Sequence, residues 1–99
     1  MHIEDDIARE GENIRFANQL KRLREYFSYS QSSLAERIEV HPIQYSKYER
    51  GVNSPKIDVL LKICRVTGVS ADWLLGLTPI DSLIIFYDNY PIVKIGGTK

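Results

Sequence analysis

The strongest constraint on the fold is the close spacing of helix-starting and helix-ending residues between positions 30 and 76. Glycines stand at 51, 68 and 76, prolines at 42 and 55, and serines at 30, 54 and 70. Glycine adopts the left-handed conformation that ends a helix, whereas serine and proline suit an N-cap and a first turn. Every helix in this stretch must therefore be short. The sequence predicts an all-α domain with no room for a sheet between residues 13 and 76.

These signals predict five helices. The first has its apolar residues at 16, 20, 23 and 27, one face of an amphipathic helix, and is expected to begin at the N-cap Asn13. The second is expected to run from the N-cap Ser30 to about Ile38, and the third from Pro42, after His41 at the N-cap, to Gly51.

The fourth and fifth helices follow from the same signals. Ser54 and Pro55 are expected to open the fourth helix and Gly68 to end it, and Ser70 and Gly76 to bound the fifth over residues 71–75. Period 3.6 then predicts the inward residues of the fourth helix, namely Ile57, Leu60, Leu61 and Cys64.

The C-terminal tail, residues 78–99, is compatible with two structures. Thr78 to Asp81 resembles a capped helix start, followed by apolar residues at 80, 83, 84 and 87 with helical spacing. Residues 83–87 and 92–95 are also rich in β-branched and aromatic residues on either side of Asp88-Asn89, as in a hairpin. The second reading, strands or mixed structure, is slightly favoured. In either form so apolar a tail should pack on its own domain or on a second subunit.

Charge is distributed unevenly, although the 99-residue chain has a net charge of zero. Residues 1–12 carry one basic and five acidic residues, a net of −4, whereas residues 13–65 carry ten basic and five acidic residues, a net of +5. The interpretation is an acidic N-terminal segment (1–12), a basic helical domain (13–77) and the tail (78–99), which is a possible dimerisation element. A basic domain between acidic ends can bind a nucleic acid.

Several classes of protein are disfavoured. The single cysteine, Cys64, lies in an apolar run and is expected to be a buried thiol in a reducing compartment. No signal peptide or membrane span is apparent, so the expectation is a cytoplasmic protein without a membrane partner. No spacing of histidine and cysteine suits a metal, and no nucleophile with a nearby base or phosphate-binding glycine loop suits an enzyme. Neither a metal nor a cofactor is expected.

Two short helices joined by a brief turn, the second with polar side chains outside, make a helix-turn-helix that fits the major groove of DNA. Several motifs here stand in the order and spacing of one family: QSSLAER (31–37), YSKYERG (45–51), Ser54-Pro55 and DWLLG (72–76). The chain strongly resembles the Cro/cI-type helix-turn-helix family of phage and bacterial repressors over about residues 13–77. The resemblance implies a compact five-helix lambda-repressor-like fold in a bacterial or phage-encoded regulator.

Carried over by position, the resemblance implies a DNA-contacting set of residues on and around the third helix. Lys47 would donate to guanine and Ile43 would contact a thymine methyl, while Gln31 would lie on a phosphate or against the third helix. Pro42 and Ile43 depart from the polar residues usual at the first two base-reading positions, so readout is expected to depend on apolar contact and DNA shape. The base-reading set is Pro42, Ile43, Gln44, Ser46 and Lys47, and the phosphate set is Gln31, His41, Arg50, Asn53 and Lys56.

The same resemblance implies that Arg24 and Glu49 form a structural ion pair between the first and third helices. Because one short helix reads too few base pairs for genomic specificity, a homodimer on a palindromic operator in double-stranded DNA is expected. The candidate dimer surface is Leu74, Leu75, Leu77 and the apolar tail.

Two functions from different classes follow. The leading one is a sequence-specific transcriptional regulator, a repressor in most such cases. The alternative is a protein-interaction module on the same fold, such as an antitoxin that binds a toxin, or a regulator that binds an anti-repressor. The apolar pair Pro42 and Ile43 on the outward face of the third helix sustains this alternative.

Overall fold

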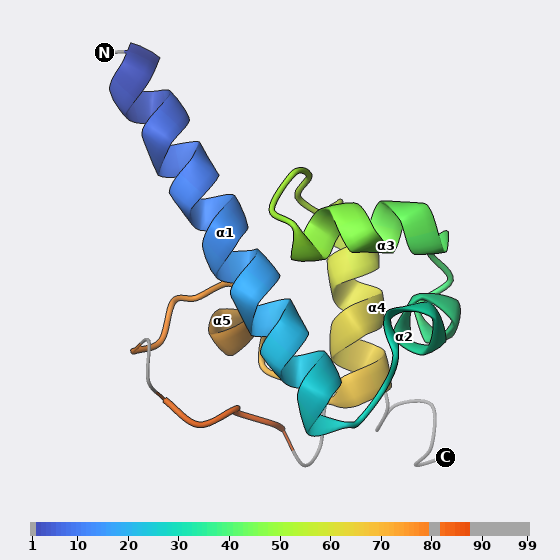
Figure 1. Ribbon diagram of the computed structural model, residues 1–99. Coiled ribbons are helices and arrows are strands. Elements are labelled where there is room, and N and C mark those ends of the chain that lie inside the picture. Colours follow the sequence, from blue (N-terminus) through green and yellow to red (C-terminus); the bar gives the residue numbers. More distant parts are fainter. Residues whose placement is uncertain (1, 80–81, 88–99) are drawn as a thin grey trace.

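Five helices form the fold in the computed structural model, which describes residues 2–79 and 82–87, with side chains from Asn13 onward. Figure 1 shows the long α1 crossing the molecule, with α2 and α3 on one side of it and α5 on the other. The described residues contain no strand, which confirms the predicted all-α class. The helices are α1 (His2–Tyr26), α2 (Gln31–Arg37), α3 (Pro42–Glu49), α4 (Ile57–Thr67) and α5 (Ala71–Leu74).

The predicted start of the first helix at Asn13 is wrong, because α1 begins eleven residues earlier, at His2. Residues 2–12 contain no proline, and their single glycine, Gly11, costs a helix only about 1 kcal/mol. An asparagine is a good N-cap, but it also continues a helix when the residues before it are helical. The division of the chain at residues 12 and 77 stays a prediction.

Three predicted helix caps are confirmed. The Ser30 hydroxyl accepts from the Ser33 amide at 3.0 Å at the start of α2, and the Ser70 hydroxyl accepts from the Trp73 amide at the start of α5. His41 caps α3, its Nδ1 accepting from the Ile43 amide at 3.1 Å. Each cap supplies an acceptor to an amide that has no partner inside its helix.

The fourth helix begins later than Ser54-Pro55 predicted. Residues 53–56 are irregular, and Lys56 occupies the N-cap position with no side-chain hydrogen bond to the helix. The predicted inward face is also partly wrong, since Ile57 is 75% exposed and Leu61 is 37% exposed. Cys64 is buried as predicted, and Ile63, which was not among the predicted inward residues, is buried beside it. The side of α4 that carries Ile57 and Leu61 therefore faces outward. The predicted helix end at Gly68 is confirmed, with a φ of 78°.

The core lies where α1 is covered by the shorter helices. Leu20 and Leu23 of α1 are completely buried with Leu34 of α2, Tyr45 of α3 and Trp73 of α5. Polar groups inside are bonded: Gln19 Nε2 donates to the Trp73 carbonyl at 3.0 Å. This core fixes the position of α3 against α1.

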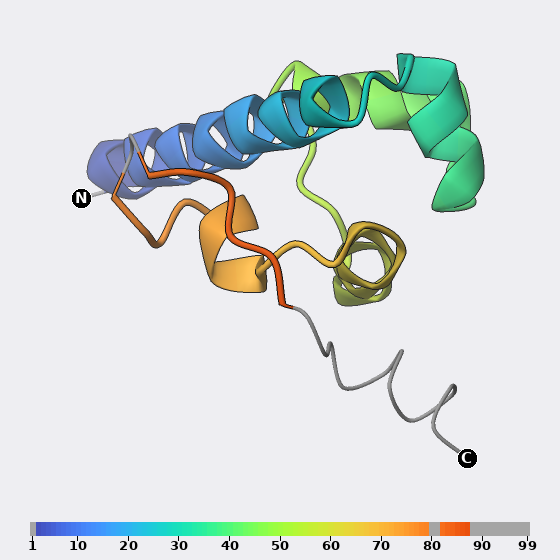
Figure 2. The ribbon, with the colours of Figure 1, turned by 90° about the horizontal axis from the view of Figure 1, so that it is seen from below.

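Residues 82–87 return along the α4–α5 connection as an extended segment (Figure 2). Val69 and Phe86 form an isolated antiparallel bridge, the Ser70 amide donates to the Ile85 carbonyl at 2.7 Å, and the Tyr87 amide donates to the Gly68 carbonyl at 2.9 Å. The helical alternative for the tail is therefore wrong over 82–87. Its other parts, Ile80, Asp81, the Asp88-Asn89 turn and residues 92–95, lie outside the described residues.

Candidate nucleic-acid interface

The turn between α2 and α3 sets the angle of the helix-turn-helix. The Val40 amide donates to the Ala35 carbonyl at 2.9 Å, and Glu39 reverses the chain with a φ of 60°. A non-glycine residue adopts this conformation at a cost of about 1 kcal/mol or more. The tight turn brings α3 out of α2 at a steep angle (Figure 1).

A carboxylate at the end of α3 ties three helices together. Glu49 accepts from Arg24 of α1 at 2.6 Å (Nε to Oε2) and 3.1 Å (Nη2 to Oε1), and from Gln31 of α2 at 3.0 Å. The Tyr45 hydroxyl, one helical turn earlier in α3, donates to the same carboxylate at 2.5 Å. The sequence analysis did not include this contact, although the spacing of four between Tyr45 and Glu49 is that of a side-chain pair on a helix.

Electrostatics hold this cluster in one protonation state. Burial acts to raise the pKa of Glu49, but hydrogen bonds from Arg24, Tyr45 and Gln31 outweigh it, so that the pKa lies below its ordinary value. The hydrogen bond to Glu49 raises the pKa of Arg24, and burial, followed by the same carboxylate, raises the pKa of Tyr45. At neutral pH the cluster is a closed ion pair, and Gln31 is held against α3.

Pro42, Ile43, Ser46 and Lys47, four of the five residues predicted to read bases, lie on the side of α3 away from the buried Tyr45 and Tyr48. The fifth, Gln44, lies one turn before Tyr48, at the edge of the buried side. Ile43 is 64% exposed, and Pro42 is exposed beside it in the first turn. The remaining three, Gln44, Ser46 and Lys47, are half-buried along the same helix. The exposed face is thus apolar at its N-terminal end and basic near its middle.

Four of the predicted contact residues line one open hollow beside α3. His41 and Gln44 border it from α3, and Asn53 and Lys56 border it from the α3–α4 loop. Arg50 is exposed at the end of α3 but does not line this hollow. The hollow brings amide, imidazole and ammonium groups together beside α3, all able to donate hydrogen bonds to phosphate oxygens. Tyr48, from the buried side of α3, and the acidic Asp58 also line it.

The prediction that Leu74 belongs to the dimer surface is wrong. Leu74 is completely buried in the core, because α5 turns it inward with Trp73. Leu75 and Leu77 are exposed and line a groove with Ile57 and Pro55, to which α1 contributes Phe16. This groove adjoins the α3–α4 loop.

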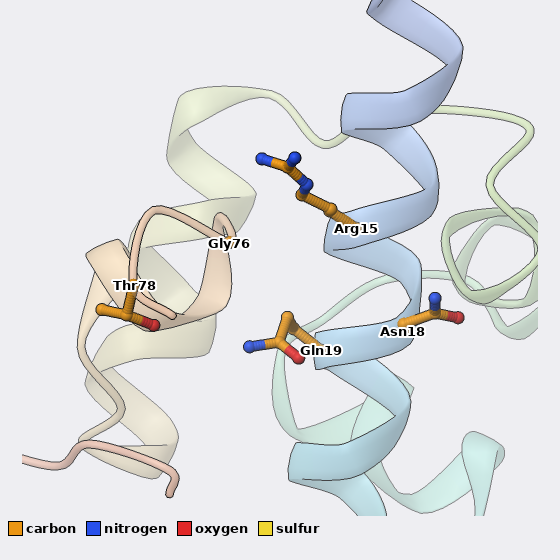
Figure 3. Close-up of a pocket in the computed structure, with 5 residues that line it drawn as sticks. All are labelled: Arg15, Asn18, Gln19, Gly76 and Thr78. Carbon is orange, nitrogen blue, oxygen red and sulfur yellow. The ribbon is translucent and has the colours of Figure 1, made fainter. Parts of the chain in front are cut away.

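A smaller hollow lies between α1 and residues 76–78 (Figure 3). Gly76 has a φ of 78°, and a Cβ on it would stand 2.9 Å from the Cδ of Arg15. Gln19 and Thr78 are already bonded, to the Trp73 carbonyl and the Ser82 hydroxyl respectively. The hollow is thus a packing feature in which the stem of Arg15 covers the glycine.

Two searches of the described residues gave negative results. None of their helices is long and apolar enough to cross a membrane. Within the same residues, no three potential metal ligands lie together.

The segment that contains α2 and α3 is similar to known proteins. A family model described as helix-turn-helix matches residues 20–74, more than half of the chain. The chain belongs to the Cro/cI-type helix-turn-helix family. Domains of this helix-turn-helix family are not enzymes.

Three proteins of Bacillus subtilis (strain 168) are similar to this helix-turn-helix chain. The HTH-type transcriptional regulator ImmR is 39% identical over 57 residues, 58% of this chain and 45% of its own length. The uncharacterized HTH-type transcriptional regulator YobD is 33% identical over 63 residues (64% and 56%), and the SPbeta prophage-derived uncharacterized HTH-type transcriptional regulator YonR is 37% identical over 60 residues (61% and 56%). The chain thus spans about half the length of the curated relatives that it matches. No solved structure matches it.

Proposed function

We propose that this chain is a DNA-binding transcription regulator that places α3 in the major groove. The observation that carries the proposal is the two-sided character of α3, which buries Tyr45 and Tyr48 and exposes Pro42, Ile43 and Arg50. An α-helix fits the major groove, and its outward residues then meet base edges. The transcriptional regulators to which the chain is similar support the same conclusion.

Within this proposal, Lys47 donates to guanine O6 or N7, and Ile43 packs against a thymine methyl group. His41, Gln44, Asn53 and Lys56 line one hollow beside α3, and Arg50 is exposed at its end, so donors to phosphate flank the reading helix. Gln31 acts differently from a free phosphate ligand, because its amide already bonds to Glu49. Its role is to hold the start of α2 against α3.

The regulator acts as a homodimer on a palindromic operator, most simply as a repressor that occludes a promoter. One α3 contacts too few base pairs to find one site in a genome, and two copies about 34 Å apart multiply the discrimination. Among the described residues, the groove of Leu75, Leu77 and Ile57 and the segment 82–87 are apolar surfaces on which this association can take place.

Selection of bound duplexes from a random library, followed by fluorescence anisotropy, tests the function. We expect an inverted-repeat consensus, at least about tenfold preference over scrambled duplex, and affinity that falls steeply with salt as phosphate contacts release counterions. Affinity independent of salt, or the absence of any preferred sequence, contradicts DNA binding by α3.

The exposed apolar pair Pro42 and Ile43 favours one other candidate, a protein-interaction module such as an antitoxin or a regulator bound by an anti-repressor. An exposed apolar residue on this face suits a protein partner as well as a thymine methyl. The two candidates differ under tagged purification from the native cell. A stoichiometric partner that is lost in Ile43→Lys, together with no selected duplex, supports the module.

A further inference from the structure

We propose that the groove between α1, the start of α4 and the end of α5 is a docking site for another protein. It takes a segment of that protein in which apolar side chains stand next to a carboxylate. Bound there, the segment blocks residues that would otherwise meet DNA phosphates. The docking goes beyond the proposed function, and only this block rests on it.

The groove is mainly apolar. Phe16 of α1 is buried and Leu60 of α4 is half-buried, and these two form its inner part. Its outer part carries Ile57, Leu75 and Leu77, which are 75%, 38% and 70% exposed. Apolar side chains that gather on one exposed surface mark a place of contact with another molecule.

The shape of the groove favours a protein segment over a small ligand. Its volume is about 450 Å³, which is within the range of small-ligand pockets. Such pockets enclose most of the surface of their ligand, whereas Ile57 and Leu77 remain mainly exposed at the edge of this groove. A protein segment covers the edge as well as the interior, as an amphipathic helix does when it lies in an apolar groove.

The charges around the groove favour an acidic segment. Among the described residues that line it, Arg15 is the charged one. Lys56 is exposed at the N-cap of α4, where it gives the first amides of the helix no side-chain hydrogen bond. The carboxylate of Asp58 accepts from the Val59 amide at 2.9 Å and so is already engaged with this turn. A guanidinium, an ammonium and a helix N-terminus all attract an anion.

The groove continues into the hollow beside α3. Asn13 and Ser54 line both of them. Asn53 and Lys56, which are proposed to hold DNA phosphates, also line the hollow. A segment anchored in the groove by its apolar side chains can therefore place its carboxylate on Lys56, as a charge-assisted hydrogen bond requires. Segment and DNA then compete, because one ammonium position cannot be occupied by both anions.

A second copy of this chain is a less suitable occupant. A two-fold interface sets a surface patch against the same patch of the other copy. Arg15 and Lys56 would then approach the same cations of the second copy, and like charges across an interface are costly. A partner with a carboxylate is attracted by both residues instead.

Peptide selection on the full chain tests the docking site. The probe is a displayed library of about twelve random residues, roughly the length of one helix. The consensus peptide is synthesised with a fluorescent label, and its dissociation constant is measured by anisotropy in the absence of DNA, with a scrambled peptide as the control. We expect a consensus with two apolar residues and at least one aspartate or glutamate.

Variants of the chain locate the peptide. We expect Leu77→Lys to raise its dissociation constant at least about tenfold, because an ammonium group would be buried among apolar side chains. Arg15→Met, which keeps an apolar stem over Gly76, should raise it about fivefold and reduce its dependence on salt. The matched control is Leu61→Lys, since Leu61 is 37% exposed on α4 and does not line the groove. Circular dichroism shows whether each variant is folded, and Ile57→Lys replaces any groove variant that is not.

Four outcomes overturn the docking site. The first is that no peptide binds better than its scrambled control, and the second is that Leu77→Lys and Leu61→Lys bind the peptide equally well. The third is a consensus without acidic residues, or one whose affinity is the same in Arg15→Met. The fourth comes from sedimentation: dimers that are lost in Leu77→Lys but kept in Leu61→Lys assign the groove to a second copy of the chain.

Competition with DNA tests the block separately. With the peptide at ten times its own dissociation constant, we expect the apparent dissociation constant of the selected duplex to rise about tenfold, as competition for one site requires. A complex that contains peptide and duplex together overturns the block. If no duplex is selected at all, the proposed function fails, whereas the peptide affinities still decide whether the groove is a docking site.

Discussion

Arg24 and Glu49 join the first and third helices through two hydrogen bonds, with Nε 2.6 Å from Oε2 and Nη2 3.1 Å from Oε1. The side chains are 15% and 4% exposed, so the pair is largely removed from water. Through Glu49 the pair also fixes Gln31 and Tyr45. The orientation of α3, and therefore of every residue on its outer face, depends on this contact.

Removal of one partner should be costly, because it leaves the other charge uncompensated in a buried place. We expect Arg24→Ala to lower the free energy of unfolding by about 2–3 kcal/mol, below the upper range for buried pairs because Arg24 keeps some exposure. Urea denaturation followed by circular dichroism measures it. The control is Lys62→Ala, which breaks the exposed ion pair with Glu39 and should leave the midpoint unchanged. Equal effects of the two substitutions would mean that Arg24–Glu49 is not a structural pair.

Acid should weaken the fold through Glu49. Its pKa is lower in the folded chain than in the unfolded chain, so it stabilises the fold above the unfolded value of about 4.3. This contribution is lost as the pH falls through the lowered folded pKa. We therefore expect the stability gap between wild type and Glu49→Gln, measured by urea denaturation from pH 7 to pH 3, to narrow below about pH 4. A gap that stays constant over this range contradicts the assignment.

Ser28 has a φ of 59° just beyond α1, a conformation that glycine adopts without strain. We expect Ser28→Gly to stabilise the protein by about 0.5–1 kcal/mol, since relief of strain exceeds the entropy that glycine adds to the unfolded chain. The matched control is Ser32→Gly, at an exposed helical position of α2, which should destabilise by about 0.5–1 kcal/mol. Thermal unfolding of both variants decides whether backbone strain is present, and the same sign for both would argue against it.

Lys47 and Arg50 should affect DNA binding in different ways. We expect Lys47→Ala to relax base preference at one position of each half-site, with a loss of about 1–3 kcal/mol in discrimination. Arg50→Ala should weaken all duplexes alike and reduce the slope of log affinity against log salt by about one. Anisotropy titrations with the selected duplex and its single-base variants separate the two. Wild-type affinity and preference in both variants would show that another face binds DNA.

Ile43 offers a test of apolar readout. Replacement of thymine by uracil removes only the C5-methyl group, so we expect a uracil-containing operator to bind wild type more weakly, by about 1 kcal/mol at the contacted base. Ile43→Ala should bind the two operators almost equally, because the side chain that contacts the methyl group is absent. Equal sensitivity to uracil in both proteins would assign the methyl contact to another residue.

The sequence by itself determined the local elements. Three predicted N-cap residues, Ser30, His41 and Ser70, each cap a helix with their own side chain. Two predicted helix-ending glycines, Gly68 and Gly76, follow α4 and α5 in the left-handed conformation. The motifs also sufficed for the family, because their order and spacing are features of sequence alone. Such signals are local, because the side chain that accepts the hydrogen bond and the amide that donates it are only two or three residues apart.

Only the tertiary structure decided burial and partners. Leu74 and Leu75 are neighbours, yet one is completely buried and the other is 38% exposed, because the turn of α5 against α1 selects a single side. Ile57 fits the inward pattern of α4 but is 75% exposed, because the helix is turned with Ile63 and Cys64 toward the core. Gln31 had two possible partners in the sequence, and the approach of α3 gave it Glu49. Periodicity tells which residues share a face, whereas the packing of whole helices determines which face is covered.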